Sequence, residues 1–180
     1  MIDDVTRDNR YVVFNSAYPN PDVWVQRLDN PAERRALVKG PFGALQGRVS
    51  PDGRWLAYSA VLPGTGPRQI FVQPFDRPGD RIQVSVNGGI GPIWRDDSRE
   101  LYYEGPEGLM AVPMSERGGA PEPGPAQKLF SVRTQGSAFS QPHNIEVAAH
   151  GQKFLVNTII GANDNVPLEV TLNWTAGLEK

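Results

Sequence analysis

Few side chains in this chain could carry out chemistry, and no catalytic pattern connects them. The 180 residues include two histidines, His143 and His150, and no cysteine. The sequence contains no nucleophile elbow, Walker loop, HExxH pair or GxGxxG fingerprint. A metal ion needs several convergent ligands, and the histidines have no acidic pair beside them. We therefore predict no catalytic residue, no metal and no cofactor.

Three aspartates recur at one place in a repeated string, and these could be misread as a carboxylate cluster. The string reads TRDNRYVVF at residues 6–14, SPDGRWLAY at 50–58, RDDSRELYY at 95–103 and AAHGQKFLV at 148–156. An aspartate can accept a hydrogen bond from an amide two residues on, and the next residue can then take a positive φ. We therefore interpret these positions as turns, one in each repeat. The turn residues are Asp8, Asp52, Gly53, Asp97, His150 and Gly151.

The spacing of the strings predicts the fold. Their starts lie 44, 45 and 53 residues apart, which is typical of a propeller blade, a four-stranded antiparallel sheet. Runs such as WLAYS at 55–59 are apolar throughout, as in strands buried on both faces. We predict an all-β propeller of about four blades in one domain, with repeats at approximately 1–43, 44–88, 89–141 and 142–180. The fourth repeat stops after its third strand and so lacks an outer strand, which suggests the C-terminal part of a larger propeller. The alternative is a self-contained four-bladed ring or a homo-oligomeric ring.

One stretch breaks the repeat, and the overall composition excludes some partners. Residues 115–125, SERGGAPEPGP, predict a mobile loop between the third and fourth strands of the third blade. The net charge is −2 with no basic stripe, which argues against nucleic acid. No apolar run approaches 18 residues, so we expect no membrane insertion by this segment. The lack of cysteine and of a signal-peptide pattern leaves the compartment undecided.

The candidate binding residues lie in loops expected at one mouth of the central channel. Loops on a rigid scaffold are where binding residues concentrate. One group enters the innermost strands, and the other links second to third strands. The first group comprises Gln46, Gly91, His143 and Asn144, and the second comprises Tyr18, Arg68, Glu104 and Asn163. We predict that this mouth contacts a protein, a peptide or a small ligand.

The repeats resemble a bacterial family. The segments SPDGRWLAY at 50–58, IFVQPF at 70–75 and GGIGPIWRDDSRELYY at 88–103 resemble the TolB-type, WD-like repeat propellers of bacteria. The ending VTLNWTAGL at 170–178 is similar to the last blade of propellers fused behind bacterial serine/threonine protein kinase domains. This repeat occurs in sensors, peptidase gating domains and scaffolds, so it implies the fold more than an activity. The kinase motifs are absent, so any kinase activity would reside in an upstream domain.

Three functions remain open at this point. The first is a non-enzymatic binding or sensor module of a larger signalling protein such as a receptor-like kinase. Such a module would be periplasmic or extracytoplasmic if the kinase is membrane-anchored, and otherwise cytoplasmic. The second is a propeller hydrolase or lactonase with an acidic or metal site in the channel, for which the inner strands offer mainly Asp4 and Glu146. The third is a structural module that pairs through the open strand edge at 169–174, with another chain or with a second copy of itself as a homo-oligomer.

Overall fold

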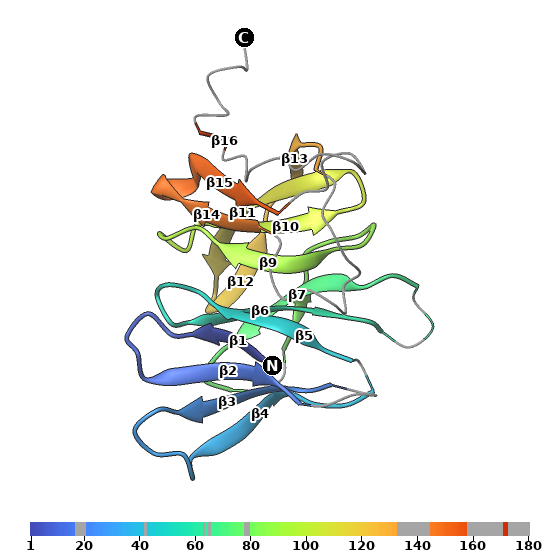
Figure 1. Cartoon of the computed structure of the whole chain (residues 1–180). Coiled ribbons are helices and arrows are strands. Elements are labelled where there is room, and N and C mark those ends of the chain that lie inside the picture. The colour runs from blue at the N-terminus through green and yellow to red at the C-terminus, as the bar shows by residue number, and fades with distance from the viewer. Residues whose placement is uncertain are drawn as a thin grey trace, which may run out of the picture.

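The computed structural model describes residues 1–16, 21–41, 43–62, 64, 66–77, 80–132, 145–157 and 171–172. In these residues the chain is almost entirely β-structure, arranged as antiparallel sheets that follow one another along the chain (Figure 1). The prediction of an all-β propeller is confirmed. Within the described residues, no helix has the length and apolar character to cross a membrane.

Each sheet is one blade, and its strands lie in chain order, except that in blade 3 both β12 and β13 pair with β11. Blade 1 contains β1 (Ile2–Val5), β2 (Tyr11–Asn15), β3 (Val23–Arg27) and β4 (Arg34–Val38). Blade 2 contains β5 (Leu45–Val49), β6 (Trp55–Ala60), β7 (Gln69–Pro74) and β8 (Ile82–Gln83). Blade 3 contains β9 (Ile90–Trp94), β10 (Glu100–Gly105), β11 (Gly108–Arg117), β12 (Ala120–Pro123) and β13 (Gln127–Phe130). Blade 4 contains β14 (Ile145–Ala148), the short 3₁₀ helix η1 (Ala149–Gly151), β15 (Lys153–Val156) and β16 (Thr171–Leu172).

The blades pack face to face, and alternation along each strand assigns every apolar side chain to one face. We call the face toward the preceding blade the entry face and the face toward the following blade the exit face. The exit face of blade 1 (Val13, Val23 and Val25) packs on the entry face of blade 2 (Leu56, Tyr58 and Phe71). The exit face of blade 2 (Trp55, Ala57, Ile70 and Val72) packs on the entry face of blade 3 (Trp94, Leu101, Tyr103 and Met110). The core between blades 3 and 4 joins Tyr102, Leu109 and Ala111 to Ile145 and Phe154. Burial on both faces explains why the second strands lack a polar–apolar alternation.

The prediction of a mobile loop at 115–125 is wrong. β11 continues to Arg117 and pairs with β12, forming a hairpin around Gly118 and Gly119, whose φ values are +61° and +80°. The two glycines supply the positive φ angles that a tight hairpin needs, so this Gly-rich segment makes a turn between two strands. β12 reaches back to contact β7 (Figure 1), and Glu116 pairs with Arg54 of blade 2. The hairpin therefore ties blade 3 to blade 2.

Candidate functional site

The described structure contains only part of the predicted channel mouth. Tyr18, His143, Asn144 and Asn163 lie outside the described residues. Gln46, Arg68, Gly91 and Glu104 lie within them, at the ends of β5, β7, β9 and β10. The contacts of these four residues are therefore the available description of the predicted channel mouth.

Gln46 holds three blades together. It sits in a bulge of β5 with φ +60°, and its side chain is buried. Its backbone amide donates to Asn15 Oδ1 of blade 1 at 3.3 Å. Its Oε1 accepts from Ser59 Oγ of blade 2 and from the Gly91 amide of blade 3, both at 2.9 Å. The bulge turns the side chain inward, so Gln46 cross-links the blades where we predicted a contact with ligand.

Arg68 and Glu104 line one cavity between blades 2 and 3. Its volume is about 490 Å³, within the range of small-ligand pockets. Its walls include four glycines and two prolines, together with Val61 and Ile90. The Arg68 guanidinium is almost fully buried, and its Nη1 donates to the Gly43 carbonyl at 2.6 Å. The pocket is thus an apolar recess with one fixed cation and one carboxylate in its wall.

The packing behind this wall requires a glycine at position 89. A Cβ on Gly89 would lie 2.8 Å from Ile70 Cγ1 and 2.9 Å from Tyr103 Cδ2, closer than carbon atoms approach in proteins. The Gly89 amide also donates to the Arg68 carbonyl at 2.9 Å. The pocket is therefore built on backbone that close blade packing holds in place.

The two acidic side chains that we considered for a channel site converge on a residue that the sequence analysis missed. Arg48 of β5 lies 3.8 Å from Asp4 of β1 and 2.6 Å from Glu146 of β14, measured between side-chain N and O atoms. Asp4 Oδ2 also accepts from the Val49 amide at 2.8 Å. Burial raises the pKa of Asp4 despite these contacts. Each of the three residues directly precedes the valine of its inner strand, so the repeat alignment contained the signal that places them together.

Asp3, the neighbour of Asp4, faces the interface between blades 1 and 2. Its side chain is 5% exposed, and its Oδ2 accepts from the Gly47 amide at 3.2 Å. Burial raises the pKa of this carboxyl from 3.8 to about 7, although the Gly47 hydrogen bond and the nearby positive charges oppose the shift. A buried carboxylic acid that titrates near neutral pH is often functional, but structural interfaces also produce such shifts.

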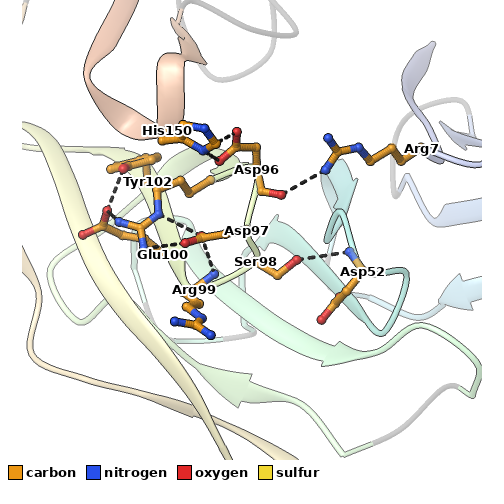
Figure 2. A network of polar contacts seen from close by, with 10 residues as sticks. Arg7, Asp52, Asp96, Asp97, Ser98, Arg99, Glu100, Tyr102 and His150 are labelled. Atoms are coloured by element: carbon orange, nitrogen blue, oxygen red, sulfur yellow. Dashed lines mark hydrogen bonds and ion pairs between the residues drawn. The ribbon is translucent and has the colours of Figure 1, made fainter.

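On the opposite end of the blades, turns from blades 1, 2 and 4 meet the turn of blade 3 (Figure 2). Arg7 Nη1 donates to the Asp96 carbonyl at 3.0 Å, and the Asp52 amide donates to Ser98 Oγ at 3.1 Å. His150 Nδ1 lies 2.7 Å from Asp96 Oδ2. We call this cluster of turns the turn hub. Asp96, which contacts both Arg7 and His150, is its centre.

The predicted turn residues lie in the turns and bond locally. Asp8, Asp52 and Asp97 each accept from the amide two residues on, at 3.0, 3.2 and 3.0 Å. The residues after them, Asn9, Gly53 and Ser98, have φ values of +56°, +75° and +63°. In the fourth repeat His150 and Gly151 lie in η1 with φ +54° and +80°. Hydrogen bonding to Arg95 lowers the pKa of Asp97 to about 2. Within the described residues, no group of three or more histidine or acidic side chains could hold a metal ion.

Comparisons with known proteins agree on the fold alone. No family model and no curated protein match the sequence. Among solved structures, TolB from Acinetobacter baumannii superposes with a TM-score of 0.63 at 15% identity, over 95% of this chain and 40% of that one. The β-propeller domain of the Trilobed protease from Pyrococcus furiosus gives 0.52 at 18%, over 92% and 50%. A candidate 6-phosphogluconolactonase from Bacteroides uniformis gives 0.54 at 16%, over 85% and 45%. The chain is a TolB-like β-propeller in its fold, and it spans half or less of each of these structures.

Proposed function

We propose that this chain is a non-enzymatic β-propeller module that binds a protein, peptide or small ligand at the pocket between blades 2 and 3. The observation that carries the proposal is the recess of about 490 Å³ that brings Arg68 and Glu104 together at the predicted mouth. Its apolar walls suit an aliphatic or peptide-like ligand, and its two charged residues would orient polar ends of that ligand. In contrast, Asp4 and Glu146 pair with Arg48 and are less available for proton transfer.

We further propose that the module belongs to a larger bacterial signalling protein, such as a receptor-like serine/threonine kinase. The resemblance of residues 170–178 to kinase-fused propellers supports this, as does the greater length of the structural neighbours. Ligand binding at the pocket would then be passed to the attached domain. If that kinase is membrane-anchored, the propeller lies outside the cytoplasm, and otherwise it is cytoplasmic.

The second candidate is a hydrolase or lactonase. The similarity to a candidate 6-phosphogluconolactonase favours it, although 16% identity carries no activity across. In that case the channel residues Asp4, Arg48 and Glu146 would face the substrate, and the 2.6 Å pair of Arg48 with Glu146 would have to open. A module that pairs through the strand edge at 169–174 is the third candidate, and only its backbone at β16 is described.

The test is a ligand titration followed by NMR, with mixtures of short peptides and of sugar lactones as probes. We expect saturable shifts of the Val61 and Ile90 methyl groups. Ile90→Trp, which fills the recess, should remove binding, whereas Leu155→Trp on the exposed face of blade 4 should leave it intact. Shifts that persist unchanged in Ile90→Trp would overturn the assignment of the pocket.

A further inference from the structure

One face of blade 1 carries the residues of a blade interface but lies open. The repeat alignment matches Val5, Val12, Phe14 and Trp24 of blade 1 with Val49, Leu56, Tyr58 and Phe71 of blade 2. By this match, these four residues form the entry face of blade 1. In blade 2 the equivalent residues are at most 8% exposed, because they pack on blade 1.

The exposure of the entry face of blade 1 is much greater. Val5 is 45% exposed, against 8% for Val49, and the nearby Ile2 is 67% exposed. Val12, Phe14 and Trp24 are half-buried, whereas Leu56 and Tyr58 are fully buried. Exposed contiguous apolar surface of this kind marks an interaction site.

The same set of positions forms the interfaces already present in the molecule. In blade 3 the entry positions hold Trp94, Leu101, Tyr103 and Met110, which pack on the exit face of blade 2. In blade 4 Phe154 and Val147 pack on blade 3. Every entry face with a preceding blade among the described residues is therefore covered by the exit face of that blade. The chemistry of blade 1 at these positions, aliphatic and aromatic, matches that pattern.

We propose that the entry face of blade 1 binds the exit face of one further propeller blade, supplied by the longer polypeptide to which the proposed function assigns this chain. The inference rests on that proposed function. The partner is a four-stranded sheet whose contacting side chains are aliphatic, like Val13, Val23 and Val25 of blade 1 itself. This chain covers half or less of the length of the structural neighbours, so those proteins have enough further residues to form such a blade.

A second copy of this chain fits the face less well. The surface it would offer is the exit face of blade 4, where Leu155 is 43% exposed. On that face Leu155 pairs with Glu146, and Lys153 lies two residues before it, paired with Ala148. Burying Lys153 against Phe14 and Trp24 would cost desolvation energy without a charged partner.

The test uses a protein in which a copy of residues 1–44 directly precedes Met1. Met1 occupies in blade 1 the position of Leu45 in blade 2, so the added blade meets blade 1 as blade 1 meets blade 2. The chain has no cysteine, so Val5→Cys in the original blade 1 gives one thiol whose labelling rate reports coverage. Val49→Cys sets the covered limit, and Val86→Cys, 78% exposed in the segment after β8, sets the open limit.

In the 180-residue chain we expect Val5→Cys to react at least about tenfold faster than Val49→Cys, since thiol reactivity follows access. In the extended protein its rate should fall to within about twofold of Val49→Cys, with Val86→Cys unchanged. Phe14→Asp in the receiving blade should restore fast labelling. Undiminished labelling in the extended protein overturns the inference, whether or not the added blade folds. Slow labelling that depends on concentration in the 180-residue chain also overturns it, in favour of a second copy. If the entry face of blade 1 is covered in the extended protein but no ligand binds at the pocket between blades 2 and 3, the proposed function is refuted and this inference is not.

Discussion

Asp3→Asn should remove a pH dependence from the stability of this propeller. The Asp3 carboxyl is buried between blades 1 and 2, and burial raises its pKa from 3.8 to about 7. In the unfolded chain the carboxyl returns to its ordinary pKa. The folded protein therefore holds this proton more tightly between about pH 4 and pH 7. The contribution of the Asp3 carboxyl to the free energy of unfolding is therefore fully present below about pH 4, and it is lost as the pH rises through about 7.

The size of the effect follows from the shift. A rise of about 3 in the pKa of Asp3 corresponds to roughly 4 kcal/mol of unfolding free energy, because a pKa shift of 1 is worth about 1.4 kcal/mol. An asparagine at position 3 keeps an oxygen that can accept from the Gly47 amide, whose bond to Asp3 is 3.2 Å long. The variant should therefore match the parent near pH 4 and be more stable than it at pH 8, by up to that amount.

The assay is urea unfolding of both proteins at pH values from 4 to 8, with equal slopes required for comparison. We expect the difference in unfolding free energy, variant minus parent, to increase steadily across this range. A difference that stays constant from pH 4 to pH 8 would mean that Asp3 has the same pKa in the folded and unfolded states, and that its burial does not destabilise the charged form.

Three further predictions concern contacts between blades and within the turn of blade 3. Arg48→Met should cost about 2–3 kcal/mol, since it leaves a largely buried carboxylate without its cation, whereas Glu146→Gln at the half-exposed end of the cluster should cost under about 1 kcal/mol; urea unfolding compares the two. Gly47→Ala should destabilise the fold by about 2 kcal/mol, because its Cβ would lie 2.8 and 2.9 Å from two valines of blade 1. Gly53→Ala should cost only about 1 kcal/mol, because its Cβ has no atom within 4 Å and only the φ of +75° is unfavourable; thermal unfolding compares the two. Asp97→Asn should destabilise the fold at pH 7, and its deficit should vanish as the pH falls from about 4 through 2, because hydrogen bonding to Arg95 lowers the pKa of Asp97 in the folded state; acid titration followed by circular dichroism measures this.

The repeat predicted the fold because each blade follows local rules. The strings at 6–14, 50–58 and 95–103 combine an Asp turn with an apolar strand, and such strands need no distant information to be recognised. The hairpin of β11 and β12 escaped prediction because glycine and proline density is common to loops and to tight turns. Only pairing with a neighbouring strand distinguishes the two.

The site was harder to predict than the fold. Arg68 lies in the loop before β7, as expected, whereas Glu104 lies within β10 and not in a loop. The cavity that they share depends on how blades 2 and 3 approach each other. Gln46 points inward because β5 contains a bulge, a backbone feature that its sequence does not announce. Arg48 and Asp96 were missed because their partners come from other blades, 44 or more residues away along the chain.

We propose above that a ligand binds at the pocket between blades 2 and 3 and leaves chemically unchanged. The most direct test of this proposal is a titration in which backbone amide shifts locate the ligand and mass spectrometry then examines the recovered ligand. We predict saturable shifts at Gly88, Gly89 and Ile90, which line the pocket, with the ligand recovered at its original mass. Shifts centred on Asp4, Arg48 and Glu146, with a ligand that has gained one water, would instead establish a hydrolase of the channel and rule out a binding module.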